Sequence, residues 1–494
     1  MALRYDFPRA DICELLSQDI LHQLVKGVFK DHLVTWVTQY ILSENGKKPG
    51  KKILDDIDRR IALVAPFAGF KQWTGNDSKA LMKVYLPVIE GYVPDDMVRA
   101  IRAFLEFCYI VRRDIIDTKG LQELQDALER FHHHRKVFER LGIQLNFNLP
   151  RQHSMVHYFR LIRAFGAPNG LCSSITETKH IQAVKEPWRR SSRFNALEQM
   201  LITNQRLDKL AAMHVDFTRQ GMLPEGQFCY SSIQPSTNFS NPSQIPTVQD
   251  NLEGDADSAP VPGPKFLAKV ELAKTKIGRN IKVQDLAHTL NEPQLLPLIR
   301  KFLFHQLHPN ADSSDSESPP KLPYFNEGIT TYSAAVAYFH APSDLCGTGG
   351  MRKERIRAIP PWRSGPSRYD CIFVETDPDG AGMLGMDIAH AWQFFSSTFR
   401  GKLYPCVLIH WFKRCGTQPS DNTGMWVVER DLDEDGKQMA CVLHLDTIIC
   451  AAHLITVYGS EPVPRNLLPG YSLDLFRKYY VNKYLDHHSF SIAF

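Results

Sequence analysis

The apolar residues of this chain change their spacing partway along it. From about residue 11 to residue 221 they recur at every third or fourth position, the pattern of one face of an α-helix. Beyond residue 324 they stand instead in short runs rich in Val, Ile, Tyr, Phe and Trp, which Gly, Pro and Asp turns divide. We therefore predict an α+β protein with a mostly helical N-terminal half and a β-rich C-terminal domain that forms a small antiparallel sheet or barrel.

The same periodicities place the individual elements. A long apolar stripe begins near residue 15, and later stretches repeat its spacing. Helices are predicted over residues 15–37, 77–91, 95–113, 120–141, 153–165, 193–219, 295–307 and 472–485. Strands are predicted over residues 332–339, 371–375, 407–412, 424–428, 439–445 and 449–458.

Two polar stretches divide the chain. Residues 223–264 are rich in Ser, Pro, Asn, Gln and Gly, and they have too few large aliphatic side chains to offset their own ordering entropy. Residues 310–323 are acidic and Ser-rich, and are predicted to be a second disordered linker. The predicted domains are a helical part at 1–222, a small helical segment at 265–309 and the β-rich domain at 324–494.

Composition limits the class of protein. The net charge of +4 is too small to indicate nucleic-acid binding by itself, although clustered cations can still form a basic face. No run of about 18 apolar residues occurs, and the N-terminus has no apolar signal-peptide core, so we predict an intracellular protein without membrane contact. The 10 cysteines include no C-x-x-C pair, which argues against a zinc cluster and a disulfide framework.

One cluster of cations stands on a Gly- and Pro-rich frame with aromatic neighbours, Trp362 and Tyr369. Such a loop can lie along a phosphate backbone, where the release of counterions favours binding. A solvated loop whose cations pair with nearby acids is the alternative. The cations are Arg352, Lys353, Arg355, Arg357, Arg363 and Arg368.

A second basic stretch follows a single carboxylate. Ser174 and Glu177 have the S-x-x-E spacing of a capping box, which satisfies two backbone amides at a helix start and needs no catalysis. A carboxylate beside a row of cations is also what a metal-dependent nucleic-acid enzyme requires. Spacing alone favours the cap. The cations that follow are Lys179, Lys185, Arg189, Arg190 and Arg193.

Many segments outside the two linkers carry long motifs in one order. They are residues 6–11 (DFPRAD), 19–32 (DILHQLVKGVFKDH), 70–75 (FKQWTG), 150–155 (PRQHSM), 165–177 (FGAPNGLCSSITE), 187–190 (PWRR), 203–209 (TNQRLDK), 338–357, 369–378, 404–411, 424–428 and 479–488. In these segments the chain resembles the fungal Plavaka transposases, which are relatives of the CACTA-type DNA transposons. The resemblance covers nearly the whole chain outside the linkers.

The resemblance implies a DNA transposase of the DDE class, whose RNase H-like catalytic core is interrupted by a helical insertion. In such enzymes three acidic side chains hold two Mg²⁺ ions about 3.5–4 Å apart, which activate the attacking water or 3′-hydroxyl and stabilise the leaving oxygen. Glu177 becomes the candidate for the third acid. Asp19 and His22 fit the D-x-x-H signature that the family has at or near its second acid, and we expect them to share a hydrogen bond on one helix face.

The resemblance also implies partners and a location. We expect DNA as the partner and the nucleus as the location, and homo-oligomer formation stays open. The candidate DNA contacts are the two basic stretches, represented by Arg189, Arg190, Arg193, Arg352, Lys353, Arg355 and Arg357. The candidate Mg²⁺ ligands are Glu177 and Asp19.

One departure from the family limits the expected activity. Asp19 stands only eighteen positions after Met1, which is too little chain for the strands that carry the first acid of the family's core. Asp6 and Asp11 are poor substitutes, because they stand at an untethered end. We therefore expect an N-terminally truncated transposase fragment that is inactive alone. A DNA- or partner-binding descendant, and a nuclease completed by a separately encoded N-terminal part, are the alternatives.

Overall fold

The chain forms two compact units. The first combines Met1–Gly170 with Ala256–Phe494, and the second is Leu171–Asp255. From the sequence we expected the β-rich residues to form a domain of their own, whereas the helices up to residue 170 share one unit with the strands. The computed structural model describes residues 17–64, 75–173, 179–222, 258–261, 268–308, 321–347, 349–360, 367–467 and 471–493.

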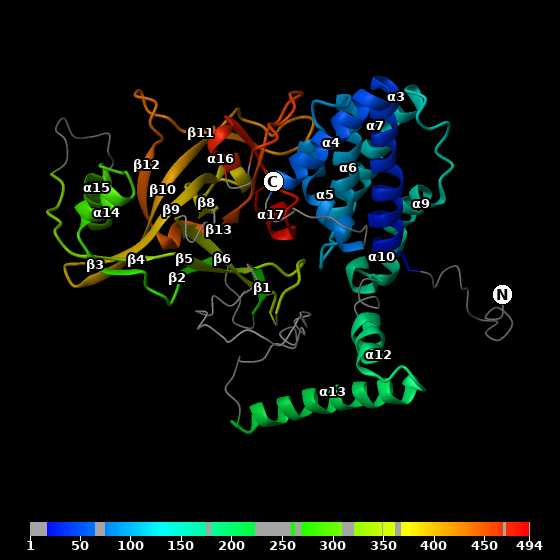
Figure 1. The fold of residues 1–494 in the computed structure, drawn as a ribbon, viewed down its shortest axis with the longest axis horizontal. Helices are drawn as coiled ribbons and strands as arrows, with labels where there is room; N and C mark the ends of the chain where they lie inside the picture. The colour runs from blue at the N-terminus through cyan, green and yellow to red at the C-terminus, as the bar shows by residue number, and fades with distance from the viewer. Residues whose placement is uncertain are drawn as a thin grey trace, which may run out of the picture. The chain divides into compact units, whose positions relative to one another are not determined.

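The N-terminal part of the first unit is helical (Figure 1). Its elements are η1 (Ile20–Val34), α3 (Thr35–Asn45), α4 (Lys47–Leu63), α5 (Gly75–Ile89), α6 (Asp95–Val111), α7 (Thr118–His134), α8 (Lys136–Arg140), α9 (Pro150–His153), η2 (Ser154–His157), α10 (Tyr158–Phe165) and η3 (Pro168–Leu171). At the centre, Phe104 of α6 packs against Phe29 of η1 and Phe131 of α7, with ring centroids 6.5 and 5.6 Å away. The helices predicted between residues 77 and 141 are confirmed.

The first helix differs in type from the prediction. The apolar stripe predicted an α-helix, whereas η1 is a π-helix, whose hydrogen bonds span five residues instead of four. Its buried side chains form two rows at four-residue spacing. The apolar stripe therefore identified the buried face correctly, although it predicted an α-helix instead of a π-helix. The rows are Leu21, Val25, Phe29 and Leu33, and Ile20, Leu24 and Val28.

The C-terminal part of the first unit holds antiparallel sheets, as predicted. The strands are β1 (Ser258–Pro260), β2 (Ala268–Leu272), β3 (Gly278–Ile281), β4 (Ile329–Tyr332), β5 (Ala334–His340), β6 (Met351–Ile359), β7 (Arg368–Tyr369), β8 (Cys371–Glu375), β9 (Met386–Phe399), β10 (Lys402–Arg414), β11 (Val427–Arg430), β12 (Ala440–His444), β13 (Ile448–Ala452), β14 (Leu454–Thr456) and β15 (Lys478–Val481). The helical segments are α14 (Val283–Thr289), α15 (Leu295–Leu307), η6 (Gly382–Leu384), η7 (Leu445–Thr447), α16 (Ser472–Leu475) and α17 (His487–Ile492). The smaller sheet has the order β1-β6-β5-β2, and the larger one has the order β13-β8-β9-β10-β11-β15-β14 with β3, β4 and β12 as side branches.

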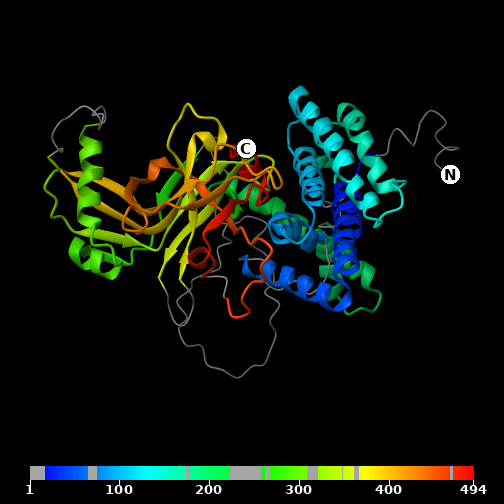
Figure 2. The same ribbon diagram turned by 90° about the horizontal axis from the view of Figure 1, so that it is seen from above.

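The two sheets and one helix pair form three layers (Figure 2). Ile299 and Leu303 of α15 share an apolar core with Phe395 of β9, so α14 and α15 cover one face of the larger sheet. On its other face, Ile388 of β9 shares a second core with Ile356 of β6 in the smaller sheet. The middle layer is therefore buried on both faces.

Several parts of the sequence form strands that the pattern did not predict, among them β9, β15 and β1. β9 lacks alternation because both of its faces are buried, so apolar residues stand on either side. The helix predicted at 472–485 is wrong: only Ser472–Leu475 is helical there, and Lys478–Val481 is β15, which pairs with both β11 and β14. Ser258–Pro260, expected in a linker, pairs with β6 as β1.

Buried polar contacts hold the helices and the C-terminal chain in one unit. Arg60 of α4 is 0% exposed, and it donates hydrogen bonds to the carbonyl oxygens of Gly459 and Glu461 at 2.9 and 3.0 Å. Lys483, which follows β15, donates from Nζ to Oε1 of Glu106 of α6 at 3.0 Å. The partners are hundreds of residues apart in the chain, so local sequence patterns cannot indicate them.

The described part of the second unit is helical. Its elements are η4 (Ile181–Lys185), α12 (Glu186–Arg190) and α13 (Ala196–Arg219). α13 confirms the helix predicted at 193–219, and Asn204 Nδ2 in it donates to the carbonyl oxygen of Ala183 in η4 at 2.7 Å. Beyond Ala196, the side chains of α13 are exposed or half-buried within the unit.

Membrane contact and a disulfide framework are the two features that composition argued against. Among the helices that the structure describes, none combines the length and the apolar character that a membrane crossing requires. The described cysteines are free thiols, and burial raises the pKa of Cys108 and Cys406.

Candidate functional site

Asp19 and His22 lie at the start of η1. Asp19 precedes the helix with extended backbone geometry, and its carboxylate accepts hydrogen bonds from the backbone N–H groups of Leu21 and His22, both at 3.2 Å. This is the arrangement of an N-cap. Nδ1 of His22 lies 2.5 Å from Oδ2 of Asp19. The shared hydrogen bond that the D-x-x-H spacing predicted is present, while a catalytic role for the pair stays a prediction.

Two of the motif segments, residues 19–32 and 150–155, meet in the structure. Arg151 donates from its guanidinium to Oδ2 of Asp31 at 2.7 Å. Its side chain also crosses η1 at Gly27, where a Cβ atom would lie 2.4 Å from Cδ of Arg151. A Cβ atom there would displace Arg151, and it would also lie 2.7 Å from the carbonyl oxygen of His22, so glycine fits position 27 best. The contact fixes the helix that Asp19 begins against α9.

Only part of the predicted Mg²⁺ site falls within the described residues. Glu177, with Ser174, Asp6 and Asp11, lies outside them, so only Asp19 and His22 of the predicted catalytic set are placed. Within the described stretches, no group of three His, Cys, Asp or Glu side chains could hold a metal ion. The carboxylate of Asp19 is already engaged by two backbone N–H groups and by His22.

Three of the predicted DNA contacts form an exposed group on the second unit, which we call the basic face: Arg189, Arg190 and Arg193. The first two end α12, and Arg193 follows in left-handed backbone geometry with a φ of 64°. Two large apolar side chains beside them, Trp188 and Phe194, are 45% and 77% exposed. Among the described residues, no ion pair or hydrogen bond occupies these three guanidinium groups. Free cations beside exposed aromatic rings are typical of nucleic-acid contact surfaces.

The other predicted DNA contacts lie on a strand instead of a loop, which corrects the sequence prediction. Successive side chains of β6 point to opposite faces of the sheet, so Arg352 and Glu354 lie on the same face as the buried Ile356. Arg352 is held by Asp344, with 3.2 Å between its guanidinium nitrogen and the carboxylate. Burial raises the pKa of Glu354 to about 8. Two inward-facing charged residues therefore concealed the strand pattern. Arg363 lies outside the described residues, and the opposite face of the strand carries Lys353, Arg355 and Arg357.

The sequence did not single out three histidines that line a pocket, His340, His487 and His488. They come from the end of β5 and the start of α17, far apart in the chain, so no metal or catalytic spacing relates them. The only available signal was that both segments, 338–357 and 479–488, carry motifs of the resemblance.

The comparison with protein families gives a match in the N-terminal residues. Residues 3–37 match the family model described as Plavaka transposase. The matched stretch includes Asp19, His22 and the whole of η1. Comparisons with curated proteins and with solved structures give no match. The match supports a relationship to the transposase family.

Proposed function

We propose that this protein derives from a DDE-class DNA transposase of the Plavaka type, and that it binds DNA without cutting or joining strands by itself. The observation that carries the proposal is the match of residues 3–37, which includes the Asp19–His22 pair. A role in the nucleus and an ancestor with an RNase H-like core are part of the same proposal. The alternative is a transposase-derived protein whose partner is another protein.

The position of Asp19 supports the second half of the proposal. Its carboxylate caps η1 and contacts His22, with all three contacts at 3.2 Å or less. Strand cleavage by two metal ions requires carboxylates that face the ions, with the ions about 4 Å apart. Asp19 in this arrangement serves the helix start, which is a structural role.

Cleavage can be tested directly on supercoiled plasmid. The protein is expected to leave the plasmid intact in the presence of Mg²⁺, because Asp19 is engaged in its cap. The measurement is the fraction of nicked plasmid on an agarose gel, compared with the Glu177→Gln variant. Nicking that requires Mg²⁺ and disappears in this variant would show a working nuclease and overturn the proposal of an inactive protein.

The basic face supports the first half of the proposal. Its three guanidinium groups are exposed, and exposed cations bind phosphate groups by displacing counterions from DNA. The exposed rings of Trp188 and Phe194 can stack on unpaired bases. Contacts of this kind fix a protein on DNA without selecting a sequence.

Replacing Arg189, Arg190 and Arg193 together with alanine is expected to weaken DNA binding and reduce its salt dependence. Each lost phosphate contact lowers the slope of log K against log salt by about 0.9, so three contacts lower it by about 2.7. Fluorescence anisotropy of a labelled duplex, measured over a series of salt concentrations, gives both quantities.

A matched control removes three cations of the same unit, Arg206, Lys209 and Arg219, which alternate along α13 with Asp208 and Asp216. We expect a smaller change in slope for this control, because the acids repel phosphate. An unchanged slope in the variant of the basic face, or an equal change in both variants, would contradict the proposed contact surface.

A further inference from the structure

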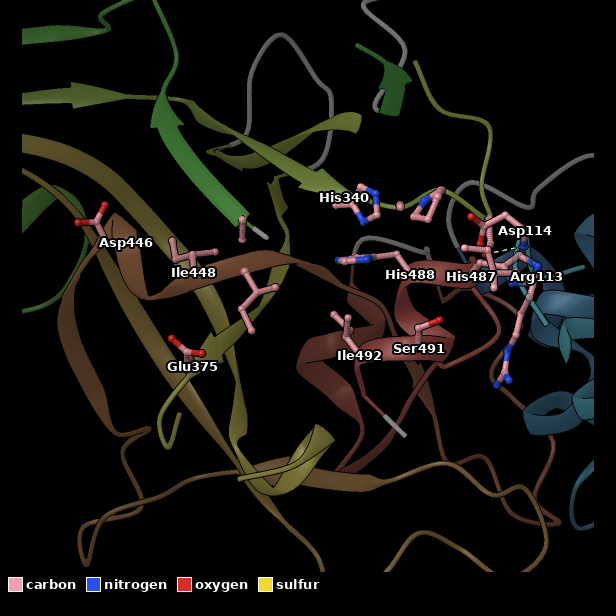
Figure 3. Close-up of a pocket in the computed structure, with 16 residues that line it drawn as sticks. Arg113, Asp114, His340, Glu375, Asp446, Ile448, His487, His488, Ser491 and Ile492 are labelled. Carbon is pink, nitrogen blue, oxygen red and sulfur yellow. Dashed lines mark hydrogen bonds between the residues drawn. The ribbon is translucent and has the colours of Figure 1, made fainter. Parts of the chain in front are cut away.

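A pocket of about 550 Å³ lies in the first unit, where the two sheets, α17 and the loop after α6 meet. Its wall includes residues of β2 and β13, each of which stands at one end of the strand order of its sheet. Figure 3 shows Glu375 and Asp446 at one end, Arg113 and Asp114 at the other, and His340 and His488 between them. The pocket is therefore an elongated groove with polar side chains along its length.

His487 is the most unusual side chain of the pocket. It is 1% exposed, and among the described residues neither of its ring nitrogens has a hydrogen-bond partner. Burial lowers the pKa of His487 well below its usual range, and the charges of Arg112, Arg113 and Lys83 lower it further. The ring is thus neutral and offers one N–H donor and one lone pair. Buried polar groups without partners are rare in native proteins and call for an explanation.

His488 has the same property in part. Its Nε2 atom is buried without a partner among the described residues, and its ring stacks on Phe339 with centroids 4.3 Å apart. Burial lowers the pKa of His488 to about 4, so this ring is also neutral at physiological pH. Two neutral imidazoles therefore line one groove.

The backbone holds these histidines firmly. Asp344 accepts hydrogen bonds from the backbone N–H groups of His487 and His488, at 3.1 and 3.0 Å. Asp486 caps α17 by accepting the N–H of Ser489 at 2.8 Å. Because both carboxylates fix the backbone at the start of α17 and both rings are buried, their unpaired nitrogens are a built feature of the groove.

The groove favours a cationic ligand at the end where Glu375 and Asp446 lie. Three carboxylates line it, Asp114, Glu375 and Asp446, against one guanidinium, Arg113. That guanidinium is itself paired with Glu123, at 2.7 Å. Glu375 and Asp446 lie at the same end, because Val374 pairs with Ile448 across β8 and β13. A phosphate-bearing ligand would meet an excess of negative charge there.

We infer that this groove binds an extended, basic peptide segment of a partner protein. A peptide amide supplies one donor and one acceptor, which is what a neutral, unpaired imidazole such as His487 requires. Ile448, Ile449 and Ile492 provide apolar surface for the side chains between its basic residues. Lysine or arginine side chains pair with Glu375 and Asp446 at the acidic end. Extended peptides commonly dock beside terminal strands of sheets, where β2 and β13 stand here.

The probe for this proposal is a short fluorescein-labelled peptide of alternating lysine and alanine, added to the full chain. We expect saturable binding by fluorescence anisotropy, and binding about tenfold weaker in the double variant Glu375→Gln, Asp446→Asn. The matched control removes two carboxylates of the exposed turn before β12, with Glu434→Gln and Asp435→Asn, and should bind the peptide as the unaltered chain does. The peptide of alternating glutamate and alanine should not bind.

A second variant, His487→Phe, keeps a ring of similar size and removes both nitrogens. It should weaken peptide binding while the melting temperature stays the same or rises, because an unpaired buried polar group is lost. Equal peptide binding by this variant and the unaltered chain would overturn the proposal, as would equal loss in the turn control. Tighter binding of adenosine monophosphate than of the lysine peptide would show instead a site for anions.

Discussion

Replacing Asp56 with asparagine is expected to lower the free energy of unfolding by about 3–5 kcal/mol, because it leaves the guanidinium of Arg60 buried without a counter-charge. Asp56 is 1% exposed and Arg60 is 0% exposed. Oδ2 of Asp56 accepts a hydrogen bond from Nε of Arg60 at 2.9 Å. Asparagine has nearly the same shape as aspartate, but its amide nitrogen can only donate hydrogen bonds and would face the N–H donors that the carboxylate accepts from. The loss therefore reports the charge pair more than packing.

The contacts of Arg60 explain why the effect reaches the whole first unit. Its terminal nitrogens donate to the carbonyl oxygens of Val88, Glu90, Gly459 and Glu461, at distances from 2.9 to 3.3 Å. Those carbonyls lie at the end of α5 and after β14, so one side chain connects three segments. A displaced guanidinium would leave all of these acceptors unpaired.

Urea denaturation at neutral pH measures this prediction. Arg59→Ala is the matched control, since Arg59 pairs with the other oxygen of Asp56 at 2.8 Å but is 31% exposed. An ion pair of a partly exposed side chain contributes about 1 kcal/mol or less. A loss in the Asp56→Asn variant no larger than that of the control would refute the central role of the buried pair.

The sequence indicated elements well where one face of an element is buried. α7 was predictable because its apolar residues recur at helical spacing along one stripe. β9 was not, because the helix pair covers one of its faces and the smaller sheet covers the other, which removes the alternation. The pattern predicts a helix where β15 lies, because that strand is determined by its pairing with β11 and β14, which local spacing does not show.

The candidate sites show the same division. The family's D-x-x-H signature singled out Asp19 and His22, and a hydrogen bond between them could be expected because residues three apart in a helix lie close together. The pocket histidines could not be predicted, because Asp344 after β5 fixes the start of α17 more than a hundred residues later. The strand β6 could not be recognised because Arg352 and Glu354 stand at inward-facing positions, where charged residues interrupt the apolar alternation that predicts a strand.

Replacing Glu106 with glutamine is expected to have an effect as large as that of Asp56→Asn, about 3–5 kcal/mol at neutral pH. Glu106 is 7% exposed and receives three hydrogen bonds from charged groups, each at 3.0 Å: Oε1 from Arg102 and Lys483, and Oε2 from Arg130. Glutamine removes the negative charge among these three cations. Lys483 is only 6% exposed, so too little water reaches its ammonium group to compensate for the lost carboxylate charge.

The pH dependence separates this charge effect from a loss of packing. Burial alone would raise the pKa of Glu106, but the charges of Lys483 and Arg102 outweigh it and lower the pKa to about 2. Since the folded-state pKa lies below the unfolded value, the carboxylate stabilises the fold fully above about pH 4.5, and this contribution is lost as the pH falls toward 2. The difference in unfolding free energy between the unaltered chain and Glu106→Gln should therefore shrink steadily across that interval.

Unfolding free energies from urea denaturation at a series of pH values test this directly. Glu123→Gln serves as the control, because Glu123 pairs with Arg113 at 2.7 Å yet is 36% exposed, and it should change stability by about 1 kcal/mol or less. A Glu106→Gln loss that is the same at pH 7 and at pH 2.5 would mean that shape, and not charge, determines it. In that case the contact between α6 and the chain after β15 would owe its stability to the apolar residues around Lys483.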